Sequence, residues 1–285
     1  MNNYYIYLWM SLAMITWAMA WTSAHIVNTY LSFYNLVFFR FLLGSLSLLP
    51  IVIFQKNKID FSWSIMQYVF PASMLFLFYN ISFFMATEGP GVGRGAVLVT
   101  TINPIITLLI MIAIKRIIKL KEIAGIALGI LGGLIIMNVF TDGLGVIFHK
   151  NNIYFLICAL TWGVMTVVVN YGQKKILPLQ FIFYCYTLTT ILALLLTDIA
   201  AIDLNSWDIN FYVNFLLVSV GAMSFGTTVY MYFTSVIGPV KSSVFIFSVP
   251  FLALGISSIF LEEIINIQTI VGGLLSLIAI YVVNK

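Results

Sequence analysis

The sequence predicts an all-α integral membrane protein with ten transmembrane helices, arranged as two inverted five-helix repeats. Hydrophobic residues make up 62% of the 285-residue chain and charged residues only 8%, whereas an ordinary soluble domain carries roughly 25% charge. A helix needs about 20 apolar residues to cross a bilayer, so this length holds roughly ten crossings and no sizeable soluble domain. Any function is therefore expected to lie within the membrane.

Apolar runs between charged or turn-forming clusters mark the ten helices in order. They cover residues 5–24, 33–54, 65–86, 92–114, 120–139, 152–171, 179–197, 210–235, 240–260 and 264–283. The first run lacks a basic leader, and bulky Trp21 follows its only small-residue motif, so we interpret it as an uncleaved helix. Cys158 and Cys185 lie inside apolar runs, where they are expected to pack as small hydrophobic residues.

The distribution of basic residues predicts the orientation. Ten crossings put both termini on one side, and the loops on that side carry most of the basic residues: Lys56, Lys58, Lys115, Arg116, Lys119, Lys121, Lys174, Lys175, Lys241 and Lys285. The opposite loops carry only Arg94 and Lys150. The positive-inside rule places both termini in the cytoplasm. The same rule accounts for the net charge of +4 without a nucleic-acid partner.

A weak internal repeat divides the chain into residues 1–145 and 146–285. The paired positions keep a spacing of 145 to 149 residues: Trp17 with Trp162, Gly89 with Gly238, Pro104 with Pro250, and Gly125 with Gly272. Each half then holds five helices, and this odd number makes the second half enter the membrane with opposite polarity. Inverted repeats are typical of secondary transporters, whose site lies near mid-membrane between the halves.

Several stretches of the chain resemble a known family. They are NLVFFRFLLGSL (35–46), FFMATEGPGVGRGAVLVTTINPIITLLI (83–110), KEIAGIALGILGGLII (121–136), YFTSVIGPVKSSVFIFSVPFLALGISSIFLEE (232–263) and QTIVGGLLSLIAIYVV (268–283). With the five-plus-five pattern, the whole chain resembles the EamA branch of the drug/metabolite transporter superfamily. The resemblance implies transport of small metabolites, commonly efflux of amino acids. The family's acidic residue after the fourth helix is matched by Glu262 or Glu263 only in the second half.

Polar residues and a proline interrupt the apolar runs of the fourth and ninth helices. Proline removes one backbone donor and frees a carbonyl one turn earlier, and polar side chains either satisfy that carbonyl or face a central cavity. The repetition in both halves favours the cavity. Mid-span aromatic residues suggest a weakly polar cavity suited to neutral or zwitterionic metabolites. The candidate substrate-binding residues are Trp17, Arg40, Tyr79, Asn80, Thr100, Thr101, Asn103, Trp162, Thr227, Tyr230, Ser243 and Ser248, and the candidate gating residues are Glu88, Pro104 and Pro250.

Arg40 is the one charge well inside a predicted span. An intramembrane charge is expensive and is usually paired or exposed to water. It is expected either to form a salt bridge or a carbonyl clamp, with Glu88 as the candidate partner, or to capture a substrate carboxylate or form an outer gate. No Asp or Glu lies at mid-span, which favours facilitated diffusion or exchange over a central proton relay.

The resulting expectation is a secondary transporter that works by alternating access, with export of amino acids or related compounds favoured. The alternatives are a non-transporting scaffold or sensor, and a carrier of lipid-like or larger metabolites. An enzyme is not expected, because the two histidines, His25 and His149, fall in predicted outer loops and no metal or catalytic motif is present. No cofactor or metal is expected. The expected partners are the substrate and the lipid bilayer, the expected home is the bacterial inner membrane, and the chain is expected to be a monomer, or a homodimer through glycine ridges.

Overall fold

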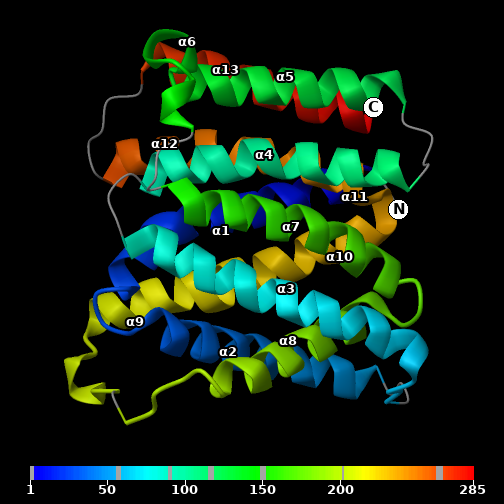
Figure 1. Ribbon diagram of the computed structural model, residues 1–285, viewed down its shortest axis with the longest axis vertical. Coiled ribbons are helices and arrows are strands. Elements are labelled where there is room, and N and C mark those ends of the chain that lie inside the picture. Colours follow the sequence, from blue (N-terminus) through cyan, green and yellow to red (C-terminus); the bar gives the residue numbers. More distant parts are fainter. Residues whose placement is uncertain are drawn as a thin grey trace.

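The computed structural model describes residues 3–55, 59–88, 92–114, 119–147, 152–200, 202–260 and 266–285. Within these ranges the regular elements are helices, which run roughly parallel in stacked layers, and both chain ends lie at the same side of the bundle (Figure 1). The Gly89-Pro90 turn, Glu262, Glu263 and His149 lie outside the described residues.

The first half contains five long helices that match the predicted stretches closely. They are α1 (Asn3–Val27), α2 (Phe33–Phe54), α3 (Trp63–Glu88), α4 (Val92–Ala113) and α5 (Leu120–Ile136), followed by the short α6 (Val139–Asp142) and the 3-10 turn η1 (Leu144–Val146). Helix α1 extends beyond its predicted end, so His25 lies in its last turn and not in a loop. Its Nδ1 is 2.7 Å from the carbonyl oxygen of Thr87, which fixes the end of α1 to α3.

The second half has the same order of helices but a less regular backbone. Helices α7 (Ile153–Gly172), α8 (Pro178–Leu194) and α13 (Ile267–Asn284) are continuous. The predicted eighth span is α9 (Ile209–Leu216), the π-helix η4 (Leu217–Thr227) and α10 (Thr228–Ile237), and the ninth is α11 (Pro239–Val244), the 3-10 helix η5 (Phe245–Ser248) and α12 (Val249–Phe260); the short 3-10 turn η3 (Leu204–Ser206) precedes α9.

Local sequence explains the sharp boundary between α10 and α11. Gly238 adopts φ 89°, a left-handed conformation that glycine reaches without steric cost. Pro239 follows at the first position of α11, where its fixed φ suits a helix start and its missing N–H would have no partner in the helix anyway. The Gly-Pro pair therefore separates two spans within a single residue.

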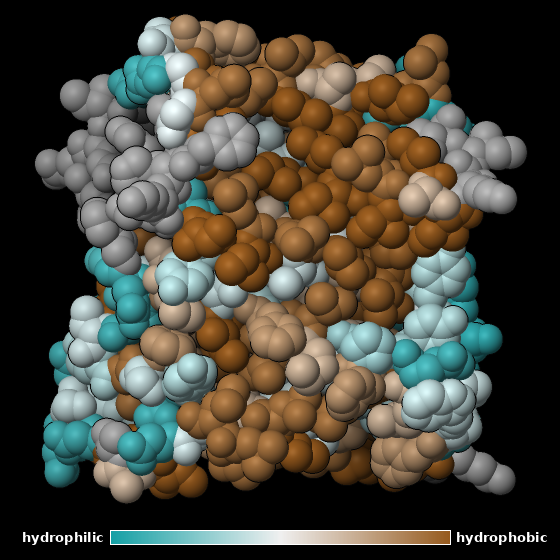
Figure 2. All heavy atoms as spheres, viewed as in Figure 1, coloured by the Kyte–Doolittle hydropathy of each residue, from teal (hydrophilic) through white to brown (hydrophobic). Residues whose placement is uncertain are grey.

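The helices form a membrane-spanning bundle. Eight described segments are long and apolar enough to cross a bilayer, whereas α8 is a shorter apolar helix and α5 has 17 residues. Hydrophobic side chains fill the middle of the visible face, and hydrophilic ones gather toward both ends of the helices (Figure 2). Such an apolar belt matches the hydrocarbon core of a bilayer. The protein is therefore an all-α, multi-pass membrane protein.

The helix pairs in contact follow a two-fold pattern. Helix α5 packs on α13, and α2 packs on α8. The counterparts of α1, α2 and α3 in the second half are α7, α8 and the span that contains η4. Helix α3 contacts α7 and α8, and η4 correspondingly contacts α1 and α2. Exchanging each helix of the first half with its counterpart in the second half therefore reproduces the same contacts, which is the packing expected of two related halves.

Glycines allow the closest of these contacts. A Cβ atom on Gly132 would lie 2.6 Å from the carbonyl oxygen of Gly272, and one on Gly272 would lie 2.5 Å from that of Gly132, so α5 and α13 pack backbone to backbone. Gly129 faces the ring of Phe247, and Gly133 faces Thr101. The glycine ridge of α5 is thus covered by side chains and backbone of the same chain.

Candidate functional site

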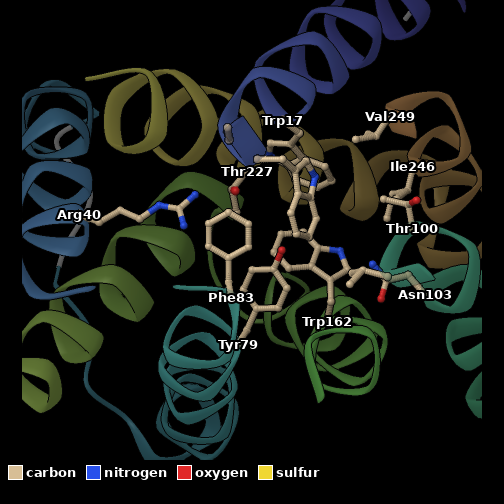
Figure 3. A pocket seen from close by; sticks show the side chains of 13 residues that line it. Trp17, Arg40, Tyr79, Phe83, Thr100, Asn103, Trp162, Thr227, Ile246 and Val249 are labelled. Carbon is tan, nitrogen blue, oxygen red and sulfur yellow. The ribbon is translucent and has the colours of Figure 1, made fainter. Parts of the chain in front are cut away.

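A small cavity lies at the centre of the bundle, where both halves of the chain meet (Figure 3). Its volume is about 30 Å³, enough for roughly two water molecules at ~10–15 Å³ each. The residues that line it are Trp17, Ala20, Trp21, Arg40, Tyr79, Phe83, Val99, Thr100, Asn103, Trp162, Thr227, Ile246 and Val249. This volume is far too small for a metabolite, so one enters only if the surrounding helices move apart.

Arg40 supplies the only charge among the lining residues. Its side chain is 5% exposed, and its Nη1 donates a hydrogen bond of 2.7 Å to Oδ1 of Asn80. Asn80 is held in turn, because its Nδ2 donates to the carbonyl of Phe76. The guanidinium carbon lies 5.2 Å and 5.6 Å from the ring centres of Phe83 and Phe84, which adds favourable cation–π contacts.

The expected salt bridge from Arg40 to Glu88 does not form. Glu88 is exposed at the end of α3, eight residues beyond Asn80, or about 12 Å along a helix. Asn80 therefore takes the place predicted for the carboxylate. It satisfies a donor but supplies no negative charge, and the structure shows no acidic partner of Arg40 among the described residues.

Asn103 and Trp162 line the cavity and each has a buried polar atom without a hydrogen bond. Asn103 is 3% exposed and its Oδ1 has no hydrogen-bond partner. Trp162 is 4% exposed, and its indole N–H lies near the Tyr230 hydroxyl without a hydrogen bond of normal geometry. The Thr100 hydroxyl, in contrast, donates to the carbonyl of Ala96 in its own helix.

Aromatic rings from both halves form the body of the site. Trp17 and Trp162 meet edge to face with ring centres 4.9 Å apart. Tyr79 lies 4.7 Å from Trp162, and Tyr230 lies 5.0 Å from Trp17. The two tryptophans expected to be equivalent thus contact each other across the junction of the halves.

The π-helix η4 is tied to this aromatic cluster. The carbonyl of Ala222 accepts hydrogen bonds from Trp17 Nε1 at 3.0 Å and from Thr227 Oγ1 at 3.1 Å. The Tyr186 hydroxyl donates to the carbonyl of Met223. A π-helix leaves carbonyls available to side chains, and such stretches occur often at functional sites. Pattern reasoning missed this feature, since residues 210–235 were expected to be one regular span.

The structure brings together seven of the predicted substrate-binding residues: Trp17, Arg40, Tyr79, Thr100, Asn103, Trp162 and Thr227. Asn80 and Tyr230 lie directly behind them, bonded to Arg40 and packed on Trp17. Three others face elsewhere: Thr101 faces Gly133, Ser243 donates to Val240, and Ser248 borders a different cavity. Pro104 lies inside α4 and Pro250 in the first turn of α12.

Six lining residues were absent from the predicted set: Ala20, Trp21, Phe83, Val99, Ile246 and Val249. Three of them lie at helical spacing from predicted residues. Ala20 and Trp21 follow Trp17 by three and four residues, and Phe83 follows Tyr79 by four, so each pair lies on one helix face. The spacing of three or four residues from a predicted residue is the sequence signal that identifies these lining residues.

Two larger cavities flank the first turns of α1. One, of about 260 Å³, lies between α1, η5, α12 and α13 and is bordered by Tyr7 and Ser248. The other, of about 250 Å³, lies beside Trp9 and Tyr232. The opposite end of α1 is closed against α3, where Asn28 Nδ2 donates to the carbonyl of Phe84. Packing around α1 is therefore looser toward the side of the bundle that holds the termini.

Comparison with known proteins agrees with this architecture. The model of the EamA-like transporter family matches residues 4–138 and 149–285, so the chain belongs to that family. A solved structure titled "Crystal structure of protein" is similar in fold, with a TM-score of 0.71 and 12% sequence identity over 99% of this chain and 98% of that chain. No curated protein sequence matches the chain.

Proposed function

We propose that the protein is a secondary transporter that moves small metabolites through the central cavity by alternating access. The observation that carries the proposal is the cavity itself, which is enclosed by helices of both family-matched segments and is lined by polar groups that have no partner. Amino acids and related zwitterionic or neutral compounds are the first class of substrate to test, with export as the favoured direction.

The proposed architecture is ten crossings in two inverted repeats, residues 1–145 and 146–285. The exchangeable helix contacts support this arrangement, and α5 and α8 then cross the membrane despite their 17 residues. The concentration of Lys and Arg on the loops beside the termini supports a cytoplasmic location for both ends. The proposed location is a bacterial inner membrane.

In the proposed cycle, the halves move relative to each other around the aromatic cluster. The contacts of His25 and Asn28 with α3 close the side away from the termini. The cavities beside Tyr7 and Trp9 leave room for α1 to move at the terminal side. Pro104, Pro250 and the non-α segments η4 and η5 are the proposed bending points, and Glu88 is retained as a candidate outer gate.

The proposal is tested by counterflow in proteoliposomes. Vesicles are loaded with an unlabelled compound, and uptake of the labelled form is followed with and without a pH gradient. A carrier gives saturable, transient accumulation that needs the internal compound. Absence of flux for a broad metabolite panel, from protein that is folded by thermal melting, would contradict the proposal and favour a non-transporting role.

A further inference from the structure

Three polar atoms at the central cavity have no hydrogen-bond partner within the described part of the chain: Arg40 Nε, Asn103 Oδ1 and Trp162 Nε1. Buried polar groups in folded proteins nearly always have one. Each of these side chains is more than nine-tenths buried, and all three line the same cavity. Their chemistry therefore describes the ligand that the cavity recognises.

The Arg40 end of the cavity selects a negative charge. Among the residues that the structure describes, no aspartate or glutamate lines the cavity, and Asn80 and the rings of Phe83 and Phe84 leave the positive charge of Arg40 uncompensated. A buried guanidinium without a counter-charge is unfavourable. Carboxylates match its planar donor geometry, and they supply the missing charge.

The Asn103 end selects an uncharged hydrogen-bonding group. Arg40 on α2 and Asn103 on α4 lie at opposite sides of the cavity, with the aromatic rings between them (Figure 3). The Asn103 amide has an accepting oxygen without a partner and an NH2 group that donates, so a hydroxyl, which both donates and accepts, fits there. Trp17, Tyr79 and Trp162 present ring surfaces between these two polar ends, which favours a flat apolar body.

We propose that the substrate is a flat organic acid with its carboxylate at Arg40 and a distal hydroxyl, such as a phenolic one, at Asn103. This inference rests on the proposed transport function and assigns it an anionic substrate in place of the zwitterionic or neutral class named above. An α-amino acid places its ammonium beside its carboxylate, and therefore against Arg40, where no acid receives it. The site is thus expected to prefer a hydroxylated aromatic acid to the corresponding amino acid.

Calorimetric titration of the purified full-length protein tests the inference with four matched compounds. Para-hydroxyphenylpropionate has both polar ends, and phenylpropionate lacks the hydroxyl. Tyrosine adds an ammonium group beside the carboxylate, and tyramine has the ammonium group but no carboxylate. We expect para-hydroxyphenylpropionate to bind tightest, with Kd values on the order of tenfold or more weaker for the other three. Para-hydroxybenzoate and para-hydroxyphenylacetate then report the preferred length.

Two substitutions assign each end of the ligand to its residue. Asn103→Val is expected to abolish the preference for para-hydroxyphenylpropionate over phenylpropionate, and Arg40→Gln to abolish the preference over tyramine. Thr141→Val, on the exposed helix α6, is the control and should keep both preferences. Because each readout is a ratio of two ligands on one protein, partial loss of folded material does not change it.

The inference is overturned if tyrosine or tyramine binds as tightly as para-hydroxyphenylpropionate, if none of the compounds binds, or if Asn103→Val keeps the hydroxyl preference. Flux separates this inference from the proposed function. Binding of the hydroxy acid without saturable counterflow would leave the inference standing and contradict the carrier. Counterflow of tyrosine with no binding of the hydroxy acid would overturn the inference and leave the proposed carrier standing.

Discussion

Helix α4 and the η5–α12 segment line the cavity from the two halves of the chain, and they differ in both backbone and polarity. Pro104 and Pro250 lie 146 residues apart. At the same spacing, Thr100 and Asn103 of α4 correspond to Ile246 and Val249 of the second segment, and all four line the cavity. At these paired positions, the polar side chains therefore belong to the first half and the apolar ones to the second.

The backbone differs in the opposite sense. Helix α4 is continuous through its proline, whereas its counterpart is divided into α11, η5 and α12. The same holds for α3, which is a regular α-helix, and η4, which is a π-helix. One half thus provides a regular, polar wall and the other an irregular, apolar wall. In the proposed cycle, the first positions the ligand and the second moves. The two repeats of the chain thus differ in the part that each would play.

The largest effect is expected when the polar wall is made apolar by Asn103→Val. Affinity for the substrate should fall on the order of tenfold to a hundredfold, because a buried acceptor for the ligand is lost. The melting temperature should stay equal or rise, since the buried Oδ1 has no partner in the structure. Binding and thermal melting of the same sample measure both.

Val249→Asn is the matched control on the opposite wall. It adds an amide without a partner, so it should lower the melting temperature and should not restore binding when combined with Asn103→Val. Restored binding in the double variant would show that the two walls are interchangeable.

Gly163→Ala tests the tight packing of α4 on α7. A Cβ atom there would lie 2.6 Å from the Ile106 side chain, and overpacking of this kind costs about 1–3 kcal/mol. Leu252→Phe, beside the cavity of about 260 Å³ at the other wall, should be tolerated with little loss of stability. If both variants lowered the melting temperature equally, the claim that the two walls differ in packing would be contradicted.

Pro250→Ala is expected to slow transport severalfold with little change in apparent affinity, because it lets a regular helix form across η5. Pro104→Ala should slow transport less, since α4 is already continuous. Initial rates of counterflow at several substrate concentrations separate the two parameters. Unchanged rates in both variants would show that neither proline acts in gating.

The smallest effect is expected from Gly226→Ala in the π-helix. A Cβ atom would lie 3.0 Å from Trp17 and 2.5 Å from Thr16 Oγ1, so Trp17 must shift by a few tenths of an ångström. Transport should fall by about twofold, and tryptophan fluorescence should report the shift. Unchanged transport and unchanged fluorescence would contradict the close contact of η4 with Trp17.

The sequence predicted most of the fold because helix length and loop charge follow directly from the bilayer. The ends of α2 and α4 were predicted to within one residue, since charged or turn-forming residues bound both runs. The π-helix η4 and the 3-10 helix η5 were not predicted, because hydrophobic periodicity does not distinguish 3.6 residues per turn from nearby values.

The site was predicted in part. Trp17 and Trp162 were chosen as candidates because they occupy equivalent places in the repeat, and Asn103 was chosen for its polarity next to Pro104; all three line the cavity. Apolar lining residues such as Ile246 carry no chemical signal of their own. The Arg40–Asn80 pair depends on how α2 rotates against α3, which a single sequence does not specify.

The central claim is that the cavity opens to each side of the membrane in turn. Thr100→Cys places a thiol in the cavity wall, after the buried Cys158 and Cys185 have been replaced by serine or alanine and transport has been verified. The account predicts that membrane-impermeant thiol reagents modify this cysteine from either face, and that a bound substrate protects it from both. Modification from one face only, or no protection by a transported compound, would contradict it.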